Sequence, residues 1–188
     1  DARIGTDFLY AGGGFGGSCF PKDVKALQRS AAEARQPLRL LAAVEAVNEA
    51  QKRVLFRKME KRFGSLKGRT FALWGLAFKA NTDDMREAPS LALIEDLVAA
   101  GAKVRAYDPV AGKQYRNENV SIVASALAAL EGADALAIVT EWREFRSPDF
   151  AAIRAKLKTP AIFDGRNLYD PAMLRELGIE YFPIGRRT

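Results

Sequence analysis

Apolar positions in the first third of the chain recur at helical spacing. A first helix is predicted from Pro21, where proline suits the opening turn, and Pro37 interrupts it. Beyond Pro37 an apolar stripe over residues 40–63 predicts one long second helix, and Gly64 supplies its end. We therefore expect residues 1–66 to form a glycine-rich loop followed by a helical arm with a long central helix.

Beyond Lys67 the pattern changes to short apolar runs that alternate with helical segments. Strands are predicted at 70–74, 104–107, 120–123, 135–139 and 161–163. Helices are predicted at 90–100, 124–130, 150–157 and 171–177. Alternation with short connections is typical of a doubly wound parallel sheet. The predicted fold is therefore α/β, with the arm followed by a Rossmann-like domain at 67–188.

Charge and composition narrow the class of ligand only slightly. The 188 residues include 29 Lys and Arg against 23 Asp and Glu, a formal net charge of +6. This excess suits an anionic ligand, whether nucleotide diphosphate, nucleic acid or membrane surface. The densest basic run, 52–62, is interleaved with apolar residues at helical spacing, which favours a solvated helix face over a nucleic-acid patch. No apolar run approaches the ~20 residues of a membrane span and no signal peptide opens the chain, which favours a cytoplasmic location.

The chain has one cysteine and no histidine. An internal disulfide, a metal site of the usual Cys/His type and a Ser-His or Cys-His catalytic pair are therefore excluded within the chain. The remaining candidate nucleophile is Cys19, which lies just before Pro21 at the predicted helix start, with Lys22 nearby. A helix amino terminus and a cation both stabilise a thiolate, and Asp23 could hold a water or accept a proton beside the sulfur. The alternative is an inert buried cysteine, with Asp23 as a partner of the helix dipole.

The loops after the predicted strands indicate where a ligand binds, because the ligand of an open parallel sheet lies outside the strands' carboxyl ends. The loop at 75–79 lacks the G-x-G-x-x-G pattern that a dinucleotide pyrophosphate requires. A mononucleotide diphosphate fits better, with Lys79 and Arg166 supplying charge and Phe78 a packing face. The alternative is that both cations are solvent-exposed.

The glycine pattern G-x-G-x-x-G does occur at 12–17, outside any strand–helix unit. It predicts either a flexible linker or backbone that approaches a ligand beside Cys19.

Three segments resemble motifs of the UDP-glucose 6-dehydrogenases, in the UDP-glucose/GDP-mannose dehydrogenase family. Residues 14–23 resemble the family's active-site motif, 75–87 its second motif and 164–167 its third, and 1–10 also match in position. The resemblance implies oxidation of UDP-glucose to UDP-glucuronate by two NAD in succession, through a thiohemiacetal and a thioester on the cysteine. It also implies that the family's NAD-binding domain is missing from this chain, so that the chain alone is expected to be inactive.

The resemblance assigns roles to individual residues. It makes Cys19 the nucleophile and Asp23 the residue that assists water and proton transfer. The implied UDP-sugar ligands are Arg3 (across a dimer interface), Phe8, Leu9, Tyr10, Gly16, Phe78, Lys79 and Arg166. Lys22 and Arg86 would face NAD, and the central helix would form a homodimer, although the pattern allows packing within one chain nearly as well.

Three alternatives remain open. One is a GDP-mannose or UDP-N-acetyl-sugar dehydrogenase. Phe20, Phe78 and Lys79 weakly favour UDP-glucose over these substrates. Another is a non-catalytic nucleotide-binding dimerisation module, for which Cys19 is incidental. The third is a basic nucleic-acid binder, whose binding would depend steeply on salt.

Overall fold

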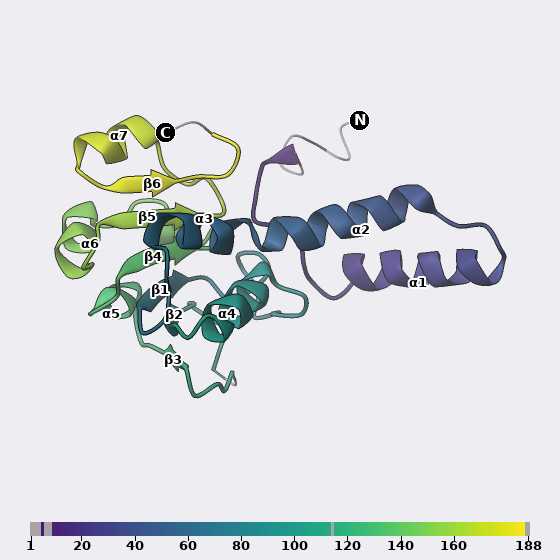
Figure 1. Cartoon of the computed structure of the whole chain (residues 1–188), viewed down its shortest axis with the longest axis horizontal. Coiled ribbons are helices and arrows are strands. Elements are labelled where there is room, and N and C mark those ends of the chain that lie inside the picture. The colour runs from purple at the N-terminus through teal and green to yellow at the C-terminus, as the bar shows by residue number, and fades with distance from the viewer. Residues whose placement is uncertain (1–4, 6–8, 114, 187–188) are drawn as a thin grey trace.

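The computed structural model describes residue 5 and residues 9–113 and 115–186, and it shows a helical arm joined to an α/β unit (Figure 1). The arm is a hairpin of α1 (Phe20–Glu33) and α2 (Arg39–Lys52). In Figure 1 the two helices lie side by side and extend away from the sheet. The Gln28 side chain donates to Glu45 across the hairpin, 2.9 Å apart. The predicted arm is confirmed, with the second helix beginning two residues after Pro37.

The apolar stripe at 40–63 belongs to two helices, so the prediction of one long helix is wrong at Arg53. There φ and ψ are −95° and 1°, and α3 (Val54–Phe63) starts at the next residue. Arg57 donates a side-chain hydrogen bond to the Ala50 carbonyl beside the break. The Arg53 guanidinium pairs with Asp96 on α4. Side-chain contacts on both sides of Arg53 therefore stabilise the change of direction between α2 and α3, which a continuous helix would not allow.

Six parallel strands form the sheet, in the order β3-β2-β1-β4-β5-β6. They are β1 (Thr70–Trp74), β2 (Lys103–Tyr107), β3 (Val120–Ile122), β4 (Ala135–Ile138), β5 (Ala161–Asp164) and β6 (Glu180–Phe182). The order reverses between β1 and β4, which confirms the doubly wound parallel sheet. The sequence pattern missed β6, a three-residue strand at the edge of the sheet.

Helices cover both faces of the sheet. They are α4 (Pro89–Ala99), α5 (Ala126–Leu130), α6 (Phe150–Lys156) and α7 (Pro171–Glu176), and a short 3-10 turn η2 spans Arg143–Phe145. One buried cluster contains residues of α3 and α4, and the other contains residues of α5, α6 and α7. Leu55 and Met59 of α3 are at most 2% exposed, so α3 is part of the α/β core although it precedes residue 67.

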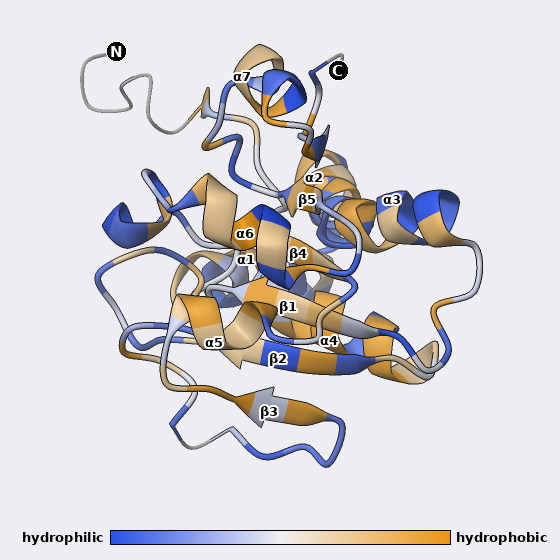
Figure 2. Cartoon of the chain, turned by 90° about the vertical axis from the view of Figure 1, so that its left-hand side faces the viewer, coloured by the Kyte–Doolittle hydropathy of each residue, from blue (hydrophilic) through white to orange (hydrophobic). Residues whose placement is uncertain are grey.

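The two-residue period of β1 explains why the core has two sides. Phe71 and Leu73 join the cluster on the α3 and α4 side, whereas Ala72 and Trp74 join the opposite one. Figure 2 shows the mainly apolar colouring of β1 and β4 that a strand covered on both faces requires. Each fully buried Leu or Phe in these clusters contributes about 1.5–3 kcal/mol. This packing fixes the positions from which the loops at the carboxyl edge start.

Candidate active site

The glycine-rich loop at 12–17 is packed against the rest of the protein, so the flexible-linker interpretation is wrong. The Gly13 N–H donates to the Gly165 carbonyl (2.9 Å) and the Gly17 N–H to the Arg86 carbonyl (2.8 Å). The loop is therefore held between the segment that follows β5 and the segment that leads into α4. On its other side it contacts α2, through Asn48 and Gln51.

Glycine is required in this loop because protein atoms occupy the places where side chains would lie. A Cβ on Gly16 would be 2.3 Å from the Glu87 carbonyl oxygen. A Cβ on Gly17, where φ is +95°, would be 2.9 Å from the Phe78 ring. The sequence suggested that the backbone of this loop approaches a ligand. In the structure the loop backbone lies against other residues of the protein.

Cys19 is exposed and immediately precedes α1, as its sequence position predicted. Its carbonyl accepts the Asp23 N–H (2.8 Å), and its Sγ is 3.6 Å from the Ser18 hydroxyl. Lys22 and Asp23 form an exposed ion pair, with 3.5 Å between Nζ and Oδ1. The alternative of a buried, inert cysteine is therefore contradicted, because solvent and small reagents reach the thiol.

Arg86 lies near Cys19 and is held by its neighbour Asp84. The carboxylate of Asp84 accepts two hydrogen bonds from the guanidinium, of 2.9 and 3.0 Å. This bidentate pair lowers the pKa of Asp84 and raises the pKa of Arg86. Arg86 remains 71% exposed, so one face of the guanidinium can meet an anion.

Three residues predicted to bind the UDP-sugar lie in the loops on either side of the glycine segment. Phe78 is partly buried against Gly17, and the ammonium of Lys79 lies 5.4 Å from its ring centroid. Arg166 forms an ion pair with Glu141 (2.6 Å) and lies beside Gly12. The interpretation as exposed cations therefore fits Lys79, but not Arg166, whose side chain is 27% exposed.

The sequence assigned no role to Asp108, and it gave Asp164 only as part of the motif at 164–167; both carboxylates shape the carboxyl edge. Asp108, which follows β2, accepts hydrogen bonds from backbone N–H groups on two loops and from the Trp142 indole. Asp164, at the end of β5, accepts from the backbone of Arg166 and from the Tyr181 hydroxyl. Burial raises the pKa of Asp164. For Asp108 the signal in the sequence was an acidic residue directly after a predicted strand.

Of the ligands predicted near the amino terminus, Arg3 and Phe8 lie outside the described residues. Leu9 and Tyr10 are 77% and 74% exposed, and Gly16 has Glu87 against its Cα.

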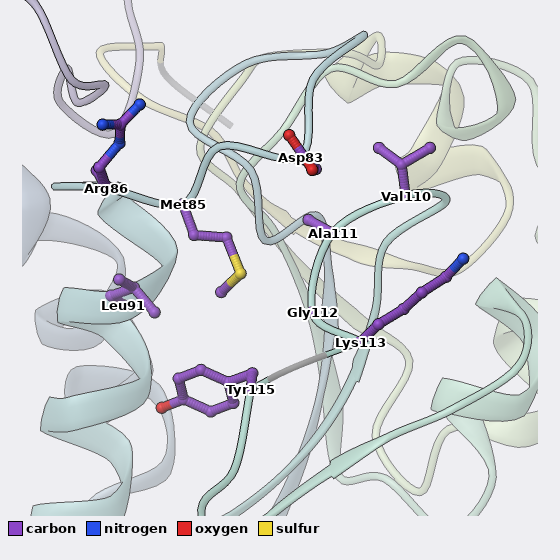
Figure 3. Close-up of a pocket in the computed structure, with 9 residues that line it drawn as sticks. All are labelled: Asp83, Met85, Arg86, Leu91, Val110, Ala111, Gly112, Lys113 and Tyr115. Carbon is purple, nitrogen blue, oxygen red and sulfur yellow. The ribbon is translucent and has the colours of Figure 1, made fainter.

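A hollow of about 470 Å³ lies between α4 and the loop after β2, apart from most of the predicted site residues. Figure 3 shows the Met85 side chain directed towards Tyr115 inside it, and the Arg86 head group directed away. Arg86 is the one predicted site residue in its lining.

Neither a metal centre nor a membrane helix is found in the part of the chain that the structure describes. Its His, Cys, Asp and Glu side chains form no group of three or more that could hold a metal ion. None of its helices combines the length and the apolar character needed to span a bilayer.

Two solved structures of nucleotide-sugar dehydrogenases are similar to this chain. A UDP-glucose dehydrogenase from Pyrobaculum islandicum is 33% identical, with a TM-score of 0.82 over 97% of this chain and 40% of its own. An NDP-N-acetyl-D-galactosaminuronic acid dehydrogenase from Methanosarcina mazei is 27% identical, with a TM-score of 0.80 over 94% of this chain and 39% of its own.

The chain belongs to the UDP-glucose/GDP-mannose dehydrogenase family. The model of the family's UDP binding domain matches residues 72–171, and that of its central domain matches residues 1–50. The UDP-glucose 6-dehydrogenase of Pseudomonas aeruginosa is 54% identical over 99% of this chain, and YwqF, the UDP-glucose 6-dehydrogenase of Bacillus subtilis, is 43% identical over all of it. The chain spans 43% of the length of each of these two relatives.

Proposed function

We propose that this chain supplies the nucleophile and the UDP-sugar site for the oxidation of UDP-glucose to UDP-glucuronate. The observation that carries the proposal is the docked loop, which holds Cys19 beside the two loops that contain Phe78, Lys79 and Arg166. The match to a UDP binding domain over 72–171 and the 54% identity to a UDP-glucose 6-dehydrogenase support the substrate class.

Arg166 and Lys79 supply the positive charge that a diphosphate requires. The guanidinium of Arg166 is already oriented by Glu141, so little side-chain freedom is lost when it meets a phosphate oxygen. Lys79 is exposed and free to move towards the second phosphate, and Phe78 offers a ring edge to the sugar or base.

Cys19 carries the covalent chemistry. Its thiolate attacks the C6 aldehyde carbon, a carbon–sulfur bond forms, and the carbonyl oxygen takes a proton to give a thiohemiacetal. After the second oxidation C6 is held as a thioester. Water then adds to the thioester, Asp23 accepts its proton, and the carbon–sulfur bond breaks to release the carboxylate and the thiol.

NAD is the proposed acceptor of one hydride in each oxidation, but the described residues form no cradle for its pyrophosphate. The loop after β1 lacks the glycine pattern, and the glycines at 12–17 are packed on protein atoms. Lys22 and Arg86 are the exposed cations beside Cys19 that can meet an NAD held elsewhere in the enzyme. We therefore expect no NADH formation by this chain alone.

We further propose a homodimer formed through α2 and a cytoplasmic location. Four residues of one α2 face are exposed, namely Leu40, Ala43, Val47 and Ala50. Their spacing of three and four residues makes a continuous apolar stripe on a helix that extends away from the sheet. A single exposed thiol is typical of a reducing compartment.

Titration calorimetry with UDP-glucose tests the UDP-sugar site. Arg166→Ala and Lys79→Ala are each expected to weaken binding about tenfold or more, because each removes a charged contact to phosphate. Cys19→Ser is the matched control and is expected to bind like wild type, since the sulfur acts on the aldehyde. Tighter binding of GDP-mannose than of UDP-glucose would overturn the substrate assignment.

A further inference from the structure

One side chain of the arm holds both polar groups of a backbone unit in the Cys19 loop. Asn48 lies on α2 and is 6% exposed. Its Oδ1 accepts the Phe15 N–H at 2.7 Å, and its Nδ2 donates to the Phe15 carbonyl at 3.1 Å. An aspartate at this position would lack the donor, and an alanine would lack both groups. The contact is therefore specific for asparagine.

The Phe15 contact is transmitted to Cys19 by a pair of aromatic rings. Phe15 packs edge-on against Phe20, with 4.8 Å between the ring centroids, and Phe20 directly follows Cys19. The segment between the two rings includes Gly17, at φ +95°, and has little conformational preference of its own. The position of Cys19 consequently depends on contacts at both ends of this segment.

A second residue of the same helix face extends the contact along the loop. Gln51, three residues after Asn48, donates to the Gly12 carbonyl at 2.7 Å. The two side chains lie on one side of α2 because residues three apart are neighbours on a helix. Side chains of α2 therefore hydrogen-bond to the loop backbone at two positions, Gly12 and Phe15.

We propose that Asn48 is a positioning residue for Cys19: by binding both polar groups of Phe15, it fixes the place from which the thiol reaches the sugar carbon. This inference rests on the proposed function, in which Cys19 is the nucleophile and Arg166 and Lys79 hold the UDP moiety. Asn48 itself touches none of these groups in the contacts described above, so its removal should separate the placement of the thiol from UDP-sugar affinity.

The test uses the intact chain, in which iodoacetamide can alkylate only one cysteine. Hydrogen exchange of residues 12–19, protection of Cys19 from alkylation by saturating UDP-glucose, and UDP-glucose affinity are measured together. In Asn48→Ala we expect loop exchange to rise about tenfold, as for the loss of a buried hydrogen bond. We also expect the protection of Cys19 to be lost while the affinity stays within about threefold of wild type.

Two further variants keep the result interpretable. Asn48→Asp keeps the shape and the acceptor and removes the donor, so it should fold and show the same change in weaker form. Asp134→Asn replaces one of the two carboxylate oxygens that accept from Arg69 and from the Thr70 N–H at the start of β1, so it is expected to lower stability without touching the loop. It should leave both loop exchange and protection at wild-type values.

The outcomes separate this inference from the proposed function. Wild-type loop exchange and protection in both Asn48 variants would overturn the positioning role. An equal change in Asp134→Asn would also overturn it, because the effect would then follow global stability. Failure of UDP-glucose to protect wild-type Cys19 would count against the proposed function, and the exchange data would still decide whether Asn48 holds the loop.

Discussion

At the scale of single residues, the loop before Cys19 shows how a glycine-rich sequence can be well ordered. Gly13 and Gly16 lie three residues apart in the same loop and have different surroundings. A Cβ on Gly13 would meet Gly165 atoms at 3.9 Å, an ordinary contact, whereas one on Gly16 would overlap the Glu87 carbonyl. Order in this loop therefore comes from close packing on neighbouring backbone.

Alanine substitutions in the loop should give unequal effects. Gly16→Ala is expected to lower the free energy of unfolding by about 1–3 kcal/mol, the usual cost of overpacking, because backbone cannot move aside as a flexible side chain does. Gly13→Ala is the matched control and should change it by less than about 0.5 kcal/mol. Urea unfolding followed by tryptophan fluorescence measures both values. Equal effects would show that the loop does not lie against Glu87.

Asp108 joins several segments at the carboxyl edge of the sheet. Its Oδ2 accepts the Leu76 and Ala77 N–H groups and the Trp142 indole, and its Oδ1 accepts from Val110 and Ala111. A charged acceptor stabilises each of these donors more than a neutral one does. The side chain is 7% exposed, so water cannot replace these bonds.

Asp108→Asn should destabilise the protein by about 1–3 kcal/mol, because its amide nitrogen faces N–H donors that need an acceptor. Thermal unfolding by circular dichroism gives the change, and a red shift of tryptophan emission would report the release of Trp142. Asp83→Asn, at an exposed position, is the control and should have almost no effect. An unchanged melting temperature in Asp108→Asn would contradict the role assigned to this carboxylate.

At the scale of elements, a cluster of charges joins the arm to the α/β unit. Lys52 of α2 has a side chain only 5% exposed, and its ammonium contacts Glu49 (2.8 Å) and Glu87 (3.4 Å). Glu87 also pairs with Lys25 of α1 at 2.8 Å. Glu87 thus contacts both arm helices from the segment that leads into α4. Removing it would leave Lys52 with one exposed partner.

Glu87 should make the free energy of unfolding depend on pH. The hydrogen bond from Lys25 lowers the pKa of Glu87 below its ordinary 4.5, with a smaller effect of Lys52. The contribution of Glu87 to stability is therefore complete above its ordinary pKa and is lost as pH falls through the lowered value.

Urea midpoints for wild type and Glu87→Gln between pH 7 and pH 3 test this dependence. The difference between the two proteins should be largest near neutrality and should shrink as wild-type Glu87 takes up a proton. Glu118→Gln, on the exposed loop before β3, serves as a control and should follow wild type at every pH. A difference that does not change with pH would contradict the ion-pair explanation.

The periodicity of the sequence predicted most of the elements, and its failures have physical causes. The strands β1, β4 and β5 were predicted because runs buried on both faces are continuously apolar, whereas β2 is buried only at alternate residues. The edge strand β6 begins with the exposed, charged Glu180 and has one buried residue, so no apolar run marks it. The break at Arg53 could not be predicted, because the apolar spacing continues through it while the partner of the stripe changes from arm to sheet.

At the scale of the whole molecule, the sequence placed Cys19 correctly but could not supply its surroundings. The position of Cys19 just before a helix follows from Pro21 and the local pattern, whereas its exposure is found only in the structure. The contacts of the loop join residues 13, 15 and 17 to Gly165, Asn48 and Arg86, each at least 33 positions further along the chain, and only the fold brings them together. Likewise, the donors that converge on Asp108 come from the backbone of two loops and from the Trp142 side chain, and no single segment predicts them.

The exposed stripe of α2 makes self-association a prediction about the whole molecule. Val47 is 68% exposed and lies within the stripe, so a charge there should prevent a second copy from packing. Sedimentation velocity is expected to show a dimer for wild type and a monomer for Val47→Asp. Val110→Asp replaces another exposed apolar residue, on the α/β unit, and should remain dimeric. A wild-type monomer at high concentration would contradict the proposed assembly.

The break between α2 and α3 makes the arm sensitive to chain length. Each residue turns a helix by about 100°. One residue inserted beside Arg53 would therefore rotate α2 relative to α3 by roughly that angle. Both helices could survive intact, yet the face bearing Asn48 and Gln51 would point away from the glycines that it now binds. We therefore expect homologous chains that retain this contact to keep the same number of residues at the joint.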